Sequence, residues 1–207
     1  YEARIVHEFD RTLAVAEPDV CALREAVREQ YPDAPESETS ITVIPIAVDT
    51  QVAQRTPAAM ASCNILTLGT LYYPPNADGI RWFLNEVFPL IQLTLPQATL
   101  TIVGKNPPDD FIQAAGASNG RVTVTGYIPD LDPYYARASV MVIPVRAGGG
   151  MRVRILEAFA RAIPVVTTTV GLEGIQAEPG SDVLVADSPV DFAQLTVRLL
   201  SDAQLQD

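Results

Sequence analysis

One stretch of the sequence combines arginines and glycines with a lack of acids. Residues 133–156 contain no aspartate or glutamate, although the chain of 207 residues carries a net charge of −11. The basic residues are Arg137, Arg146, Arg152 and Arg154, and Gly148, Gly149 and Gly150 lie between the second and third of them. A helix is predicted to follow, so backbone N–H groups, the positive helix end and guanidinium groups would converge. This pattern indicates a phosphate or diphosphate site; the alternative is a flexible turn beside a solvated basic face.

Other glycines follow predicted strands. Gly69 and Thr70 follow a strand predicted at 64–68, Gly104 and Lys105 follow one at 100–103, and Gly126 and Tyr127 follow one at 121–125. In open α/β sheets, ligands bind outside the carboxyl ends of the strands, so these turns are candidate binding positions. Lys105 is the only lysine of the chain. It is suited to a second phosphate contact, or it is an ordinary exposed lysine.

Glu157 is the acidic residue nearest to the basic stretch on its carboxyl side. It lies three residues after Arg154 and four before Arg161, a spacing typical of ion pairs within a helix. A carboxylate one to two turns into an anion-binding helix could instead accept hydrogen bonds from ribose hydroxyls. The spacing alone leaves both interpretations open.

Composition excludes several classes of protein. The hydrophobic content of 48% excludes disorder, and the net charge of −11 excludes a general nucleic-acid binder. Cys21 and Cys63 lack the spacing of a zinc or redox motif and are expected to be buried free thiols. No segment has the length of a membrane span or the profile of a signal peptide, so we expect a cytoplasmic protein. The start at Tyr1, inside a charged segment, suggests a piece of a longer protein.

Periodicity predicts the elements that position these residues. Strands are expected at 12–15, 41–44, 64–68, 100–103, 121–125, 140–143, 164–168 and 183–185, and helices at 17–30, 78–95, 110–115, 151–162 and 190–200. Residues 31–40 are expected to form a surface loop and residues 50–62 a linker. Trp82 is interpreted as a packing residue rather than a platform for a sugar, and His7 as a surface or packing residue rather than a base. Apolar strands that alternate with helices predict an α/β fold, a doubly wound parallel sheet covered on both faces.

Three segments carry a family resemblance. The runs that start at Gly126 (GYIPDLDPYYA), Val140 (VMVIPVRAGGGMRVRILEAFA) and Ile163 (IPVVTTTVGLEG) resemble the nucleotide-sugar-binding domain of family four retaining glycosyltransferases. Those enzymes have two Rossmann-like domains, the GT-B architecture. The likeness covers about residues 64–200, and earlier segments resemble the end of the acceptor domain. It implies that residues 1–49 are the end of that domain and the crossover, that 50–62 are a linker, and that 63–207 bind the donor.

The resemblance implies roles for individual residues. Gly69 and Thr70 would lie near the donor diphosphate, Lys105 near the nucleoside, and Tyr127 and Ile128 beside the base. The N–H groups of Gly148, Gly149, Gly150 and Met151 would face the diphosphate or sugar, and Glu157 would hold the ribose. The family often has a pair of glutamates eight positions apart. If Glu157 is the later of the two, the earlier position is occupied here by Gly149.

A subgroup with three glycines followed by Arg-x-Lys, and with Pro-Asn after the first strand, is more similar. Asn76 follows Pro75 here, and Arg152 and Arg154 match the basic pair, with arginine in the lysine position. Residues 71–77 contain no basic residue, so phosphate binding would depend on Arg146, Arg152 or Arg154.

The resemblance implies transfer of a sugar, of the hexosyltransferase type, from a nucleotide-diphosphate sugar with retention of configuration. No cofactor, metal or protein nucleophile is expected, because the departing diphosphate would be stabilised electrostatically. Polysaccharide or glycoconjugate biosynthesis is the expected setting, and the missing acceptor domain the expected partner. The isolated fragment is expected to bind donor without transferring sugar. A nucleotide-sugar epimerase of the same architecture and a non-catalytic nucleotide- or anion-binding module are the alternatives.

Overall fold

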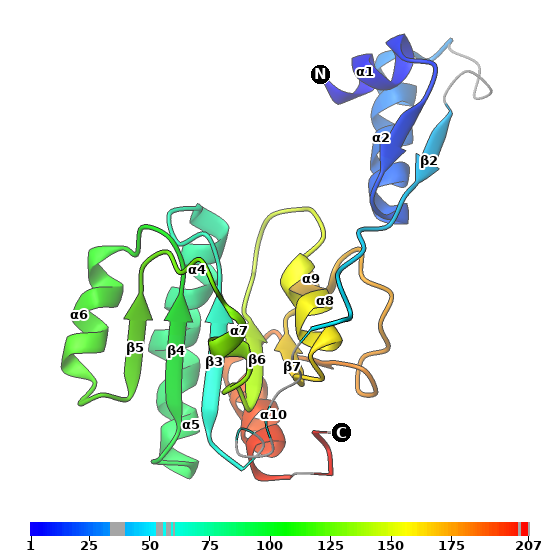
Figure 1. Ribbon diagram of the computed structural model, residues 1–207. Coiled ribbons are helices and arrows are strands. Elements are labelled where there is room, and N and C mark those ends of the chain that lie inside the picture. The colour runs from blue at the N-terminus through cyan, green and yellow to red at the C-terminus, as the bar shows by residue number, and fades with distance from the viewer. Residues whose placement is uncertain (34–39, 53–55, 57–58, 60, 203, 207) are drawn as a thin grey trace.

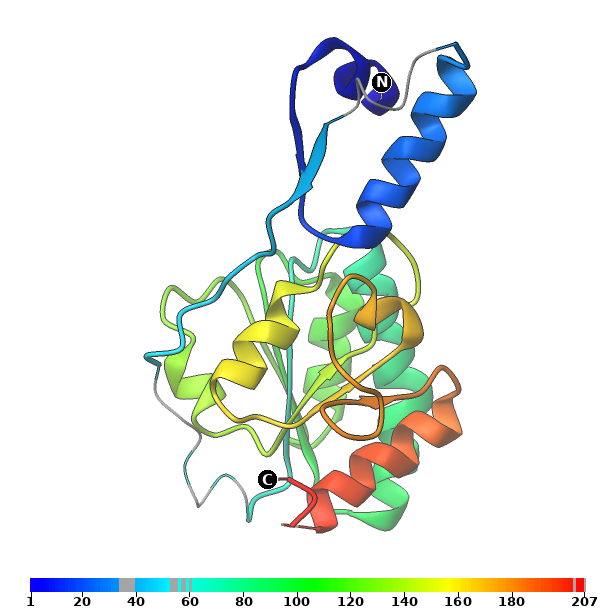
Figure 2. The same cartoon turned by 90° about the vertical axis from the view of Figure 1, so that its right-hand side faces the viewer.

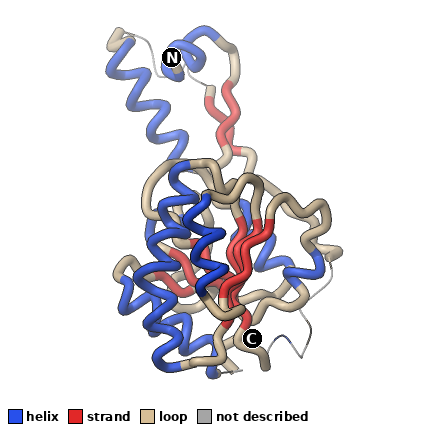
Figure 3. Tube along the Cα trace, turned by 90° about the vertical axis from the view of Figure 1, so that its left-hand side faces the viewer, coloured by secondary structure: helices blue, strands red, loops and turns tan. Residues whose placement is uncertain are grey.

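The computed structural model describes the chain except residues 34–39, 53–55, 57–58, 60, 203 and 207. Its first part is a small unit with the elements α1 (Glu2–Glu8), β1 (Thr12–Ala14), α2 (Glu17–Gln30) and β2 (Ile41–Val43). The strands pair in parallel, with Thr12 opposite Ile41. In all three views this unit stands above the larger domain (Figures 1, 2 and 3), and the arrows of Figure 1 show that this is the side of the carboxyl ends of the strands. Most of the loop expected at 31–40 and part of the linker expected at 50–62 lie outside the described residues.

The larger domain is built on one parallel sheet. Its strands are β3 (Asn64–Leu68), β4 (Thr99–Val103), β5 (Val122–Thr125), β6 (Val140–Ile143), β7 (Val165–Thr167) and β8 (Leu184–Val185). The spatial order is β5-β4-β3-β6-β7-β8, and every pairing is parallel. The chain builds outward from β3 in one direction and from β6 in the other. The winding therefore reverses between β3 and β6, which is the topological switch point of a Rossmann-like sheet.

Side chains alternate between the two faces of the sheet, as the two-residue period of a strand requires. On β6, Val140 and Val142 enter one core, and Met141 and Ile143 enter the other. The first core packs against α4 (Pro74–Trp82), a π-helical turn (Phe83–Val87), α5 (Phe88–Thr94), α6 (Asp109–Ala117) and α10 (Pro189–Ser201). The second packs against α7 (Asp132–Tyr135), α8 (Val153–Ala160) and α9 (Thr169–Leu172). The predicted doubly wound sheet with both faces covered is confirmed.

The boundaries of two predicted helices differ from the structure. The helix expected at 78–95 begins at Pro74 instead, because proline fits the first turn, where no N–H donor is needed. It contains the π-helical turn just before Pro89, whose nitrogen cannot donate the regular helical bond. The helix expected at 151–162 begins at Val153, because the backbone of Arg152 is not helical.

The structure tests the predictions for Trp82, His7 and the two cysteines. Trp82 is buried and meets Phe192 edge-on at 5.5 Å between ring centroids, and His7 stacks on Tyr31 at 4.3 Å. Trp82 is thus a packing residue, and His7 is an exposed residue that stacks on a neighbour, in agreement with both predictions. The two cysteines are free, but Cys21 is exposed and Cys63 only half-buried, so the prediction of buried thiols is wrong. Within the described residues, no helix combines the length and apolar character needed to cross a membrane.

Candidate functional site at the sheet switch point

A cavity of about 180 Å³ lies at the switch point, between the ends of β3 and β6. Gly69 and Thr70 line it where the chain leaves β3, and Pro144 and Val145 where it leaves β6. The other predicted site residues that line it are Asn76, Arg152 and Arg154. The Asn76 amide donates to the Thr70 carbonyl at 3.3 Å, so α4 holds the turn after β3. The structure thus brings five of the predicted residues together around one opening.

Residues 146–152, which we call the glycine loop, run from the cavity-lining Val145 to Arg152, which also lines the cavity. Gly148 and Gly150 have φ of +98° and +90°, a left-handed backbone that favours glycine. The guanidinium of Arg152 donates to the carbonyls of Gly148 at 2.5 Å and Gly149 at 2.8 Å, and also to that of Gly150. The loop therefore curls its carbonyl oxygens around one cationic side chain.

The N–H groups of the glycine loop remain available. Those of residues 148–151 make no hydrogen bond within the described part of the chain. In a trans peptide the N–H points away from the preceding carbonyl, so the groups after Gly148, Gly149 and Gly150 point away from the Arg152 guanidinium. The expected convergence of these N–H groups and the Arg152 guanidinium on one point is therefore not found. The free N–H groups can still donate to an anion that approaches the loop from the side away from that guanidinium.

Arg146 turns away from the cavity. Its guanidinium bonds Asp78 of α4 at 3.0 Å and lies 5.5 Å from the Trp82 ring centroid. The local charge excess read from the sequence is therefore partly neutralised by an acid 68 residues earlier in the chain. Asp78 lies far outside residues 133–156, so no local pattern indicates this pair.

Glu157 sits on α8 in a cluster with Tyr135, Arg154, Arg161 and Asp132, which we call the Glu157 cluster. Its Oε2 accepts from the Tyr135 hydroxyl at 2.6 Å and from Arg154 Nη1 at 2.5 Å. The ion pair with Arg154, one of the two interpretations that the spacing left open, is present. Burial lowers the pKa of Arg154, but the hydrogen bond and charge of Glu157 outweigh it and raise the pKa overall.

Arg161 does not use its side chain to pair with the carboxylate of Glu157. It donates to the Glu157 backbone carbonyl at 3.3 Å and to Asp132 Oδ1 at 2.7 Å. Its guanidinium lies 4.3 Å from the centroid of the Tyr135 ring. The spacing also left open an ion pair between the Arg161 and Glu157 side chains, but the Arg161 guanidinium pairs with Asp132 of α7 instead.

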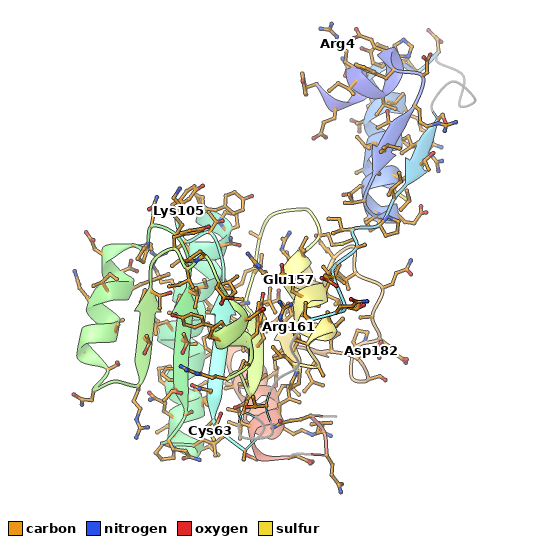
Figure 4. All side chains as sticks on the ribbon, in the orientation of Figure 1. Arg4, Cys63, Lys105, Glu157, Arg161 and Asp182 are labelled. Atoms are coloured by element: carbon orange, nitrogen blue, oxygen red, sulfur yellow. The ribbon has the colours of Figure 1, made fainter. Side chains whose placement is uncertain are left out.

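The remaining predicted residues lie along the same edge, outside the cavity lining. Lys105 and Tyr127 are exposed, after β4 and β5, and Ile128 packs partly buried against the second core. Figure 4 shows Lys105 across the sheet from Glu157 and Arg161. Within the described residues, no group of three or more His, Cys, Asp or Glu side chains is placed to hold a metal ion.

Tyr135 is the site residue that sequence reasoning missed. It is buried, with 1% of its surface exposed, yet its hydroxyl contacts the carboxylate that the resemblance assigns to ribose. The only feature of the sequence that could have indicated a buried hydroxyl here is the Tyr134-Tyr135 pair, which lies five residues before the buried strand β6. The sequence does not indicate that its partner lies 22 residues later.

Comparison with solved structures places this fold among glycosyltransferases of GT-B architecture. TarM superposes with a TM-score of 0.77 at 15% identity, over 99% of this chain and 39% of TarM. HepE from Anabaena, solved with UDP and glucose, superposes with a TM-score of 0.76 at 16% identity, over 99% of this chain and 57% of HepE. WaaG, a glycosyltransferase involved in lipopolysaccharide biosynthesis, gives 0.68 at 17% identity, over 94% of this chain and 54% of WaaG. At these identities the likeness establishes the fold alone.

The sequence is similar to one relative and to one family model. An uncharacterized 44.6 kDa protein in the cps region of Klebsiella pneumoniae is 30% identical over 139 residues, which are 64% of this chain and 36% of that protein. The chain thus spans little more than a third of that relative. The family model described as glycosyl transferases group 1 matches residues 62–202, which include the whole six-stranded sheet and the Glu157 cluster. This chain belongs to the glycosyl transferases group 1 family.

Proposed function

We propose that this chain is the donor-binding half of a retaining glycosyltransferase of family four, in the subgroup with a Gly-Gly-Gly/Arg loop. It would bind a nucleotide-diphosphate sugar whose sugar is moved to an acceptor. The observation that carries this proposal is the switch-point cavity, because Arg152 and Arg154 line it and the glycine loop beside it has free N–H groups. Residues 1–49 would be the end of the acceptor domain, and other residues of the protein would supply its remainder.

The size of the cavity favours a diphosphate within it. About 180 Å³ is less than the roughly 300 to 1,000 Å³ of pockets that enclose a whole drug-sized ligand. We therefore assign the cavity to the diphosphate and the exposed edge toward Tyr127, Ile128 and Lys105 to the nucleoside. Glu157 would accept hydrogen bonds from the ribose.

The chemistry follows from where charge develops. When the bond between sugar and diphosphate breaks, negative charge grows on the diphosphate. N–H groups and guanidinium groups that are already oriented stabilise such charge without further reorganisation. In this proposal the residues of the chain bind and orient the leaving group, and neither a metal nor a cofactor takes part.

The test is ligand binding by the 207-residue chain. We expect UDP, GDP or ADP, or one of their sugars, to raise the unfolding temperature; a ligand at 100 times its Kd adds about 2.7 kcal/mol of apparent stability. Arg152→Ala and Glu157→Ala should each weaken binding by about tenfold, since hydrogen bonds to charged groups contribute about 1.5 to 3 kcal/mol.

Arg121→Ala is the matched control. Arg121 lies just before β5, at the opposite edge of the sheet, and donates to the Gln97 carbonyl. This variant should bind as the wild type does. The absence of a shift with every nucleotide, or full affinity in both site variants, would contradict the proposed function. Sugar transfer by the isolated chain would contradict the expectation that the fragment only binds donor.

A further inference from the structure

The two oxygens of the Glu157 carboxylate are used differently. Oε2 accepts from both the Tyr135 hydroxyl and Arg154. Oε1 makes no hydrogen bond within the described part of the chain, and the Glu157 side chain keeps 25% of its surface exposed. An ionised carboxylate accepts on both oxygens, so Oε1 is an oriented acceptor that still has its full capacity.

Three kinds of contact fix the Tyr135 side chain: core packing, the Arg161 guanidinium and the Glu157 carboxylate. Its ring belongs to the second core and lies under the Arg161 guanidinium at 4.3 Å. Arg161 is fixed in turn by Asp132, three residues before Tyr135 on α7. Burial, with a further contribution from the hydrogen bond and charge of Glu157, raises the pKa of Tyr135, so its hydroxyl keeps its proton. Toward Glu157 it acts as a hydrogen-bond donor with one fixed direction.

The two donors to Oε2 differ in what else they can do. Arg154 lines the switch-point cavity, so an anion there competes for its guanidinium. Tyr135 does not line that cavity and has no such alternative. The terminal torsion of a glutamate is broad, so a carboxylate without a fixed donor turns freely. With an anion bound, Tyr135 is the donor that keeps Oε2 occupied and Oε1 free.

We infer that Tyr135 is a positioning residue, which holds the Glu157 carboxylate so that Oε1 faces the ribose hydroxyls of the donor nucleotide. This inference rests on the proposed function. It adds that the preference for a ribonucleotide over its 2′,3′-dideoxy form depends on Tyr135, a buried tyrosine that does not touch the ligand.

The experiment compares two ligands on two tyrosine variants by calorimetry. The ligands are UDP and 2′,3′-dideoxy-UDP, with GDP and its dideoxy form as the second pair. We expect the wild type to bind the hydroxylated ligand about tenfold more tightly, as a hydrogen bond to a charged group allows. Tyr135→Phe should reduce that preference to roughly threefold or less, while its affinity for the dideoxy ligand stays within about twofold of the wild type.

Tyr134→Phe is the matched control. It makes the same chemical change one residue earlier, and Tyr134 is half-buried against the same core without a side-chain hydrogen bond in the described part of the chain. Its preference should equal that of the wild type. In the double variant with Glu157→Gln, Tyr135→Phe should cause no further loss, because both changes act on one contact.

The outcomes separate the inference from the proposed function. An equal loss of affinity for both ligands in Tyr135→Phe, or an unchanged preference, would overturn the positioning role while donor binding stands. If the wild type bound none of UDP, GDP, ADP and their sugars, the proposed function would fail and the inference with it. A structure of the wild type with UDP gives a second measurement that needs no variant. One Glu157 carboxylate oxygen on the Tyr135 hydroxyl and the other on the ribose would support the inference, and a carboxylate that has left Tyr135 when it binds the ribose would overturn it.

Discussion

The glycine loop and the Glu157 cluster meet at the start of α8 but are held by different interactions. The loop is exposed, and its shape depends on hydrogen bonds from Arg152 to its own carbonyls. The cluster is half-buried, and its side chains come from two helices that pack against one core. One region can adapt to a charged ligand by moving a single side chain. The other presents an acceptor whose direction is fixed before any ligand arrives.

This difference suggests a division of labour. An exposed loop with few buried contacts opens at low cost, which suits a group that must bind and leave in every cycle. A carboxylate fixed by a buried donor loses little freedom on binding, which favours selectivity for one arrangement of hydroxyls. Within the proposed function, the loop would serve the diphosphate and the cluster would recognise the sugar ring of the nucleoside.

The largest expected effect on stability is at the contact between α4 and Pro144, just before the glycine loop. A Cβ added at Gly79 of α4 would lie 2.1 Å from the carbonyl oxygen of Pro144, where the chain leaves β6. That oxygen belongs to the backbone, so relief requires α4 to move away from the sheet. We expect Gly79→Ala to lower the free energy of unfolding by about 3 kcal/mol, at the upper end for an overpacked core. Urea denaturation measures this.

Gly149→Ala is the control at the tip of the loop. An added Cβ there has no atom within 4 Å, and the residue has no positive φ. Its free energy of unfolding should stay within about 0.5 kcal/mol of the wild type, as for an ordinary surface change. Equal losses in the two variants would mean that the tip is as tightly packed as the contact between α4 and Pro144.

Regular patterns made most of the fold predictable. The eight strands of the described residues were all predicted from short apolar runs; those at the centre of the large sheet are buried on both faces and therefore have few polar residues. The site edge followed from the fold class, since turns after parallel strands meet at one edge. The short helices α1, α7 and α9 were missed, because four to seven residues are too few for a helical period to be recognised.

At the site, the contacts that could not be predicted are those between residues far apart in the sequence. The glycines and Arg152 are close in sequence, so their pattern predicted a loop with a cation. The Arg146–Asp78 pair joins residues 68 apart, and the Tyr135–Glu157 bond depends on α7 lying against α8. No local pattern encodes either contact, because each depends on how two elements pack after the sheet has formed.

The support beneath the Glu157 cluster gives an intermediate effect. The Arg161 side chain is 11% exposed, stacks on Tyr135 and bonds Asp132. We expect Arg161→Ala to lower the free energy of unfolding by about 2 kcal/mol, as for a desolvated contact between a cation and a ring. Arg4→Ala, which breaks an exposed pair with Glu8, should change it by less than about 0.5 kcal/mol. If both variants unfolded at the same urea concentration, the cluster would be no more rigid than the surface.

The smallest expected effect concerns Arg146, at the start of the glycine loop. Because Asp78 already neutralises it, Arg146→Ala should change diphosphate affinity by no more than about twofold, whereas Arg152→Ala should cost about tenfold. The exposed pair adds less than about 1 kcal/mol to stability.

Asp78→Asn sharpens the test, since it removes the neutralising charge and leaves the arginine in place. If affinity rose in Asp78→Asn and this gain vanished in the double variant with Arg146→Ala, the pair would restrain a cation that can reach the ligand. If Arg146→Ala alone cost tenfold, the loop would have to rearrange on binding and release Arg146 from Asp78. The contrast between an adaptable loop and a fixed cluster would then extend to the first residue of the loop.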